Sequence, residues 1–207
     1  MGLPVPTMTD PKLRGLVLAG GQSSRMGSDK AALLIGGRTL LARSVELLQP
    51  LTTAVHVAVR AEQADSQLRR QFALLFDVAP AQGPAAALVA AWMHDPDAAW
   101  LVLACDMPAM ERTALEALVT GRDPSRGGTA WRNPEDDLPE PLCAIWEPAT
   151  LARLAAVVRQ AGNGAVSPRA LLAAADPLLL SPAPPAVLGS VNTPDDLHRY
   201  LELSDGH

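Results

Sequence analysis

Short apolar runs alternate with segments of helical periodicity along most of this chain. Residues 13–18 form the first apolar run, and an amphipathic segment at 39–49 follows it. Fully apolar strands are those buried on both faces, and helices between them are the usual crossovers of a parallel sheet. The pattern predicts a three-layer, Rossmann-like α/β sandwich with a mostly parallel sheet. The expected strands are 13–18, 54–59, 74–76, 100–104, 129–131 and 142–146, and the expected helices are 39–49, 62–72, 83–93, 111–119, 148–160, 170–175 and a last one beginning at 193.

The size and composition of the chain suit one folded domain. Its 207 residues are enough to bury a substantial core, and 48% hydrophobic against 19% charged residues argues against disorder. No internal repeat or shift in composition divides the sequence. We therefore expect a single domain over residues 11–203, with frayed ends at 1–10 and 204–207.

Charge and cysteine content exclude several classes of function. The net charge of −5 and the pI near 5.3 leave no general basic surface for nucleic acid, so any nucleotide must be bound by a few placed cations. Cys105 and Cys143 show no metal-ligand or redox spacing, which predicts two reduced thiols. Residues 1–11 lack the pattern of a secretory signal, and no apolar stretch is long enough to span a bilayer. We expect a cytoplasmic protein that has neither nucleic acid nor membrane as a partner.

The first apolar run opens into a loop that is rich in glycine, serine and cationic residues, from Gly20 to Lys30. Gly20 and Gly21 allow backbone N–H groups to approach a phosphate closely, and Ser23 adds a hydroxyl donor. Arg25 offers a planar fork to phosphate oxygens, whereas Lys30 offers a compact point charge. Lys30 is also one of only two lysines in a chain that otherwise uses arginine. The loop is predicted to bind phosphate.

Other phosphate-binding loops match this segment poorly. It lacks the Gly-Lys-Ser/Thr ending of a P-loop, and its adjacent glycines differ from the three spaced glycines of a dinucleotide site. An ordinary strand-to-helix turn with a solvated arginine and lysine remains the alternative interpretation.

Acidic residues follow two of the other predicted strands. Asp77 comes directly after residues 74–76, and Asp106 comes shortly after residues 100–104. Ligands of open α/β sheets bind beyond the carboxyl ends of the strands, where these two side chains are expected. A carboxylate beside a phosphate loop is a suitable ligand for Mg²⁺, so Asp106 is the candidate metal ligand. The alternative for both residues is a turn or helix-capping role.

Two segments of the sequence resemble a known family. The pattern Gly-Gly-x-Ser-x-Arg-Met-Gly-x-Asp-Lys at 20–30 closely resembles the signature loop of the molybdenum cofactor guanylyltransferases, and Cys-Asp-Met-Pro at 105–108 is similar to their metal-binding segment. The resemblance implies Mg²⁺-dependent transfer of GMP from GTP to molybdopterin or the molybdenum cofactor, with release of pyrophosphate. It also implies contacts with molybdoenzymes or other cofactor-synthesis proteins.

The resemblance assigns roles to individual residues. Asn192 matches one residue of an Asn-x-Asn-Thr-Pro segment near the family's pterin site, whereas Ser190 replaces its first asparagine. Arg169, at an expected helix start, is either a second phosphate ligand or a solvated charge. The implied nucleotide-binding residues are Leu18, Ala19, Gly20, Gly21, Ser23, Arg25, Lys30, Asp77 and Asp106, of which Arg25, Lys30 and Asp106 are catalytic and Asp106 binds the metal. The implied acceptor residues are Asn192 and Ser190, and the expected helix start adds Arg169 as an acceptor candidate.

Two departures from the family pattern fall in the expected nucleotide site. Ala87 replaces the last glycine of a Gly-Pro-Leu-Ala-Gly segment, and Arg60 stands where the family has asparagine. The Leu-Ala-Gly-Gly form of the loop at 18–21 resembles GTP users more than CTP users, so a CTP-dependent cytidylyltransferase, or a transferase for another phosphorylated acceptor, is the alternative. A non-catalytic protein that binds nucleotide and delivers the cofactor is an alternative of another class, and the presence of both Lys30 and Asp106 argues against it.

Overall fold

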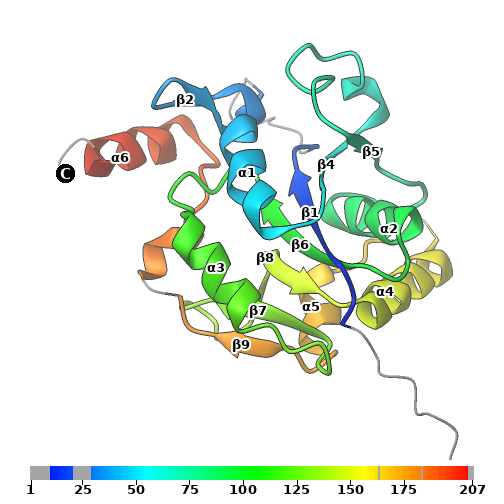
Figure 1. Ribbon diagram of the computed structural model, residues 1–207. Coiled ribbons are helices and arrows are strands. Elements are labelled where there is room, and N and C mark those ends of the chain that lie inside the picture. The colour runs from blue at the N-terminus through cyan, green and yellow to red at the C-terminus, as the bar shows by residue number, and fades with distance from the viewer. Residues whose placement is uncertain (1–9, 21–28, 163, 183, 205–207) are drawn as a thin grey trace, which may run out of the picture.

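A seven-stranded sheet runs through the centre of the protein in the computed structural model, which describes residues 10–20, 29–162, 164–182 and 184–204 (Figure 1). Its strands are β1 (Leu13–Leu18), β4 (Val55–Val59), β5 (Leu74–Phe76), β6 (Ala99–Ala104), β7 (Gly128–Arg132), β8 (Pro139–Trp146) and β9 (Leu178–Leu180). The helices are α1 (Leu40–Leu48), α2 (Pro84–His94), α3 (Arg112–Thr120), α4 (Pro148–Ala161), α5 (Pro168–Ala173) and α6 (Pro194–Ser204). A hairpin of β2 (Leu34–Ile35) and β3 (Arg38–Thr39) and the short 3₁₀-helices η1 (Lys30–Ala32), η2 (Gln49–Leu51), η3 (Ala61–Gln63) and η4 (Pro185–Leu188) complete the described elements.

The strand order in the sheet is β5-β4-β1-β6-β8-β7-β9. Four neighbouring strands, from β5 to β6, are parallel, and β9 is parallel to β7. Of these seven strands β8 alone is reversed, being antiparallel to both β6 and β7. The predicted mostly parallel sheet is confirmed, and so is the Rossmann-like α/β class.

Helices cover both faces of the sheet and close two hydrophobic cores (Figure 1). On the face of α1 and α3 the sheet buries Val17 and Leu101. On the face of α2, α4 and α5 it buries Leu16 and Val102. Adjacent residues of β1 and β6 serve opposite cores because side chains alternate along a strand. The continuous apolar runs of the sequence are therefore strands buried on both sides.

Local signals in the sequence fix the ends of several helices. The Thr39 hydroxyl accepts from the backbone N–H of Ala42 (3.2 Å) at the start of α1, and the Ser167 hydroxyl accepts from Ala170 (3.2 Å) at the start of α5. Gly83 precedes α2 with φ 58° and ψ −146°, a conformation that is essentially confined to glycine. These caps explain why the predicted bounds of the helices agree closely with the observed ones.

The helix predicted over residues 62–72 is wrong. Only η3 is helical there, and turns follow it, closed by bonds such as Arg69 N–H to Ser66 O (2.9 Å) and Phe72 N–H to Arg69 O (3.0 Å). Leu68 and Phe72 pack against the core from these turns. Arg69 is drawn inward by polar partners that lie far away in the sequence, and a local periodicity cannot reveal such contacts.

Three further features differ from the sequence prediction. The hairpin of β2 and β3 was not predicted, although the Gly36-Gly37 pair between its strands has the positive φ values (58° and 76°) that a tight two-residue hairpin loop requires. The edge strand β9 was also not predicted, because it is only three residues long and its side chains do not alternate between apolar and polar. β8 begins at Pro139, three residues before the predicted start, where Pro139 pairs with Arg132 of β7.

Trp146 and the two cysteines lie in the interior of the protein. Trp146 is a core residue, fully buried, and its indole N–H donates to the Pro141 carbonyl (3.0 Å). Cys105 and Cys143 are both buried and free. Within the part of the chain that the structure describes, no helix combines the length and the apolar character needed to cross a membrane.

Candidate active site

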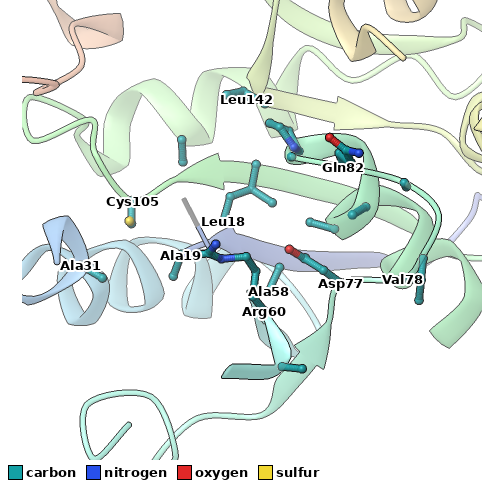
Figure 2. Close-up of a pocket in the computed structure, with 18 of the residues that line it drawn as sticks. Leu18, Ala19, Ala31, Ala58, Arg60, Asp77, Val78, Gln82, Cys105 and Leu142 are labelled. Carbon is teal, nitrogen blue, oxygen red and sulfur yellow. The ribbon is translucent and has the colours of Figure 1, made fainter. Parts of the chain in front are cut away.

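A cleft of about 740 Å³ opens at the carboxyl ends of the parallel strands, beside the start of α2 (Figure 2). The sheet order places Asp77 after β5, Arg60 after β4, Gly20 beyond β1 and Asp106 after β6, so these residues follow one another along the edge of the sheet. All four line the cleft. The cleft is therefore where the fold positions the predicted chemistry.

Lys30 lies at the centre of a polar cluster that joins three distant parts of the chain. Its Nζ donates to Asp106 Oδ2 at 3.0 Å and to Asn192 Oδ1 at 2.7 Å. Asn192 Nδ2 in turn donates to the Ser190 hydroxyl at 2.7 Å. The backbone N–H of Val191 donates to the Asp106 carbonyl at 2.8 Å, which fixes the 190–192 segment beside the residue that follows β6. The structure thus brings together Lys30, Asp106, Asn192 and Ser190.

Asp29 supports this cluster from the other side of Lys30. Its Oδ1 accepts from the backbone N–H of Ala31 at 3.1 Å and so caps η1, whose first residue is Lys30. Burial acts to raise the pKa of Asp29, but the hydrogen bonds and charge of Arg69 and the Ala31 N–H outweigh it, so this pKa lies below its ordinary value. Asp29 therefore stays ionised and holds its partners at neutral pH.

Asp77 and Arg60 form a second polar pair in the same cleft. Figure 2 shows both side chains directed toward the middle of the cleft below Leu18. Burial raises the pKa of Asp77 to about 6; the Arg60 charge opposes this shift, and the Glu62 charge adds to it. Asp77 Oδ1 and Arg60 Nε are buried, with no hydrogen-bond partner among the described residues. Unpaired buried donors and acceptors are unfavourable, so this pair is poised to bind a polar ligand.

Gly20 lies against the Asp77 carboxylate and the backbone of Arg60. A Cβ at this position would lie 3.4 Å from Asp77 Oδ2 and 3.6 Å from the Arg60 backbone nitrogen. A methyl group would therefore be in van der Waals contact with both atoms and would reduce the space beside the Asp77 carboxylate. Glycine keeps that space open to a ligand.

The thiol beside the metal-ligand candidate is not a nucleophile. Cys105 precedes Asp106 and lines the cleft. Burial raises its pKa to about 12, and the neighbouring charge of Asp106 adds to the shift. Because the thiolate is the reactive form, Cys105 is inert at neutral pH.

The other predicted site residues fall in three groups. Leu18, Ala19 and Ala87 line the cleft, Ala87 from the first turns of α2. Arg169 binds Asp136 (2.7 Å) and Glu140 (3.1 Å), which ties α5 to the residues before and within β8, and its described partners do not include the Lys30 cluster. Gly21, Ser23 and Arg25 lie outside the described residues.

Arg69 and Asp29 are polar residues of the site that no sequence pattern indicated as a pair. Arg69 donates two hydrogen bonds to the Asp29 carboxylate and one to the Ala19 carbonyl. They are 40 residues apart in the chain, and Arg69 lies in the segment that was mistaken for a helix. Apart from the Asp-Lys ending of the loop, the sequence holds no signal for this pair.

The donor set suits a hard divalent cation. Asp106 offers a carboxylate at the cleft. The Lys30 ammonium donates both to this carboxylate and to the amide oxygen of Asn192, so the two oxygen ligands lie close together. No group of three or more His, Cys, Asp or Glu side chains gathers into a metal site within the described ranges. Mg²⁺ is commonly held by one or two carboxylates together with substrate phosphates and water, so the residues present fit this ion in company with a nucleotide.

The fold and the cleft together define an α/β nucleotide-binding protein, with its ligand site at the carboxyl edge of the sheet. The profile of the MobA-like NTP transferase domain matches residues 15–182. This chain belongs to that family of nucleotidyltransferases.

Individual relatives agree with the family profile. A probable molybdenum cofactor guanylyltransferase of Rhodopirellula baltica is 31% identical over 202 residues, which cover 93% of each chain. A molybdenum cofactor biosynthesis bifunctional protein of Synechocystis is 29% identical over 185 residues, 89% of this chain and 52% of that protein. The chain therefore spans about half the length of this second relative.

Solved structures share the fold at lower identity. Molybdopterin-guanine dinucleotide biosynthesis protein A of Archaeoglobus fulgidus superposes with a TM-score of 0.74 at 22% identity, covering 94% of this chain and all of that one. A Mycobacterium tuberculosis protein crystallised in complex with manganese superposes with a TM-score of 0.60 at 18% identity, covering 94% of this chain and 100% of that one.

Proposed function

We propose that this protein transfers GMP from GTP to the terminal phosphate of molybdopterin or the molybdenum cofactor and releases pyrophosphate. The observation that carries the proposal is the Lys30 ammonium, held between Asp106 and Asn192 at the nucleotide cleft of a MobA-like chain. A relative that matches 93% of this chain is named a probable molybdenum cofactor guanylyltransferase. The catalytic domain comprises residues 11–203 and acts in the cytoplasm, alongside molybdoenzymes or other proteins of cofactor synthesis.

The reaction needs positioning and charge neutralisation more than a strong base. A phosphate oxygen of the acceptor attacks the α-phosphorus of GTP, and the bond from that phosphorus to the bridging oxygen of pyrophosphate breaks. The nucleophile is already anionic, so no proton has to be removed from it. Catalysis then consists of holding the two phosphates in line and stabilising the charge that builds on the leaving group.

Each site residue has a role in this scheme. The backbone of Leu18, Ala19, Gly20 and Gly21 lies along the nucleotide, and Ser23 and Arg25 bind its phosphates from the loop. Lys30 binds the oxygens of the leaving pyrophosphate. Asp106 holds Mg²⁺, which supplies charge neutralisation and Lewis acidity when bound.

The guanine base fits the second polar pair of the cleft. Guanine carries N–H donors at N1 and N2 and acceptors at O6 and N7. Asp77 offers a carboxylate to the donors, and the Arg60 guanidinium offers donors to an acceptor. Asp77 Oδ1 and Arg60 Nε have no described hydrogen-bond partner, and the guanidinium contacts Glu62 through Nη1 (3.2 Å), so Nε is left for a ligand. Cytosine presents a donor at N4 where guanine presents the O6 acceptor, so the pair favours GTP over CTP.

The acceptor approaches from the C-terminal side of the cleft. Asn192 and Ser190 lie beside Lys30 and offer an amide and a hydroxyl to the terminal phosphate or the pterin. Arg169 is placed on α5, where it can contact the acceptor only if it leaves Asp136 or Glu140.

A transfer assay tests the proposal directly. Purified protein is incubated with Mg²⁺, molybdopterin or the molybdenum cofactor, and GTP, CTP, ATP or UTP in separate reactions, and both dinucleotide and pyrophosphate are measured. We expect kcat/KM for GTP to exceed that for CTP at least tenfold, roughly 1.4 kcal/mol in the transition state. Preference for CTP would assign the cytidylyl reaction, and nucleotide binding without pyrophosphate release would leave a non-catalytic delivery protein.

A further inference from the structure

One buried guanidinium joins the described residues on either side of the glycine-rich loop. Arg69 is 2% exposed and lies in the turns that connect β4 to β5. Its Nη2 donates to the Ala19 carbonyl (2.9 Å) and to Asp29 Oδ1 (2.9 Å), and its Nη1 donates to Asp29 Oδ2 (2.5 Å). Ala19 follows β1, and Asp29 precedes η1. A single side chain therefore holds the exit of β1 and the entrance of η1 in a fixed relation.

The contacts of Arg69 continue to the catalytic lysine. Asp29, which Arg69 binds, also accepts from the Ala31 N–H and thereby caps η1. Lys30 is the first residue of η1, and its Nζ reaches Asp106 and Asn192. We propose that Arg69 is a positioning residue, which acts through Asp29 to set the place of Lys30 in the active site.

The chemistry of the side chains explains why Lys30 needs Arg69 and Asp29 to hold its backbone in place. Lysine has a flexible four-carbon stem, so the position of its ammonium depends on how well its backbone is held. The Asp29 side chain is 41% exposed and would turn toward water without its partner. The planar fork of arginine fixes both carboxylate oxygens and still has a donor for the Ala19 carbonyl. Packing of Leu68 and Phe72 against the core anchors the turns that carry it.

The chain offers a matched control at the opposite edge of the sheet. Arg122 donates to both carboxylate oxygens of Glu147 (2.7 and 2.9 Å) and to the Pro11 carbonyl (3.0 Å). Pro11 precedes β1, and Glu147 follows the reversed strand β8, so this cluster lies away from the cleft. Loss of either arginine removes the hydrogen bonds that it donates to one carboxylate and one backbone carbonyl. Only the loss of Arg69 should affect Lys30.

The first arm of the test needs no nucleotide. Amide hydrogen exchange is measured for residues 29–33 in Arg69→Met, Arg122→Met and the unmodified protein. We expect Arg69→Met to accelerate hydrogen exchange at the Ala31 N–H by at least about tenfold, whereas Arg122→Met should leave the exchange rate at Ala31 unchanged. Arg69→Lys serves if the methionine variant does not fold, because it keeps the charge and loses the fork. Unchanged exchange at Ala31 in the Arg69 variants would overturn the proposal.

The second arm asks whether Arg69 acts through Lys30, and this arm rests on the proposed function. The affinity for GTP and Mg²⁺ is measured for Arg69→Met in the normal background and in Lys30→Ala. Residues that act through one another give non-additive effects, so we expect a loss of roughly tenfold in the normal background and of less than about twofold in Lys30→Ala. Equal losses in both backgrounds would refute the positioning role. Absence of GTP binding by the unmodified protein would refute the proposed function instead, and the exchange arm would still decide whether Arg69 holds η1.

Discussion

Acidification should weaken GTP binding because the Asp77 carboxylate takes up a proton near neutral pH. Burial raises its pKa to about 6, against the partial opposition of Arg60. A carboxyl group with this pKa is ionised to about nine-tenths at pH 7 and to about one-tenth at pH 5. An affinity that requires the ionised form falls in proportion to that fraction. We therefore expect the Kd of GTP to rise about tenfold between these pH values.

The same shift has an opposite consequence for the stability of the nucleotide-free protein. In the unfolded chain Asp77 loses its proton near the ordinary aspartate pKa of 3.8, whereas the folded protein keeps it up to about pH 6. Between these values the folded state binds more protons, so this group lowers the stability as the pH rises. Asp77→Asn removes the effect. The variant should unfold at a higher temperature than the unmodified protein at pH 7 and should bind GTP more weakly.

Calorimetric titration of GTP with Mg²⁺, repeated across this pH range for both proteins, measures the effect. The phosphates of GTP also titrate near pH 6, but they do so equally with both proteins, so the ratio of the two Kd values isolates Asp77. Glu62 and Arg60 face the same cleft, and their charges are present in both proteins. The prediction fails if the ratio is constant from pH 5 to 7, because Asp77 would then not contact the nucleotide as an anion.

Substitutions at two further positions test other parts of the structure. Lys30→Ala should lower kcat on the order of 10²-fold, and Lys30→Arg should also be damaging, because a guanidinium cannot replace an ammonium held between oxygens at 2.7 and 3.0 Å; full activity of the arginine variant would make Lys30 a generic cation. Burial and the charges of His94 and Arg14 lower the pKa of His56, so the folded protein prefers the neutral ring and should lose stability as the pH falls below about 6.5. In His56→Leu the melting temperature should depend less on pH below that value. An unchanged dependence of the melting temperature on pH would contradict this prediction.

Much of the fold was predictable because six of the seven strands of the central sheet, and most helices, carry their own local signal. β1 and β6 are continuous apolar runs, α1 and α5 have capping hydroxyl groups, and α2 begins at Gly83-Pro84. The failures occur where tertiary contacts decide. Residues 62–72 have a helical pattern of apolar side chains, but the buried partners of Arg69 impose a series of turns.

The site was predictable in its members more than in its connections. Lys30, Asp106 and Asn192 stand out by residue type and by resemblance, and the structure joins them through contacts across 76 and 162 residues. Nothing in the sequence states that the ammonium lies between the other two, because that depends on the order of strands and on the return of the chain after η4. The Arg69–Asp29 pair was invisible for the same reason.

The charges that line the cleft support the proposed dependence on a divalent cation. Lys30 and Arg60 are the cations among its described lining residues, and four carboxylates accompany them: Asp29, Glu62, Asp77 and Asp106. Arg69 neutralises Asp29 from behind. The described residues therefore give the cleft no net positive charge, which supports the proposal that a divalent cation acts together with Arg25 to neutralise the triphosphate.

Removal of Mg²⁺ should weaken GTP binding, whereas neutralising Asp106 in the absence of Mg²⁺ should not. Removing Mg²⁺ with EDTA should weaken GTP binding by the unmodified protein at least tenfold, roughly. Asp106→Asn should keep the fold, because the two side chains have nearly the same shape, and should lose most Mg²⁺-dependent turnover. In EDTA this variant should bind GTP at least as well as the unmodified protein, because a carboxylate facing the phosphates has been neutralised. Titration of GTP with and without Mg²⁺ measures all four affinities. An equal gain from Mg²⁺ in both proteins would show that Asp106 does not hold the metal.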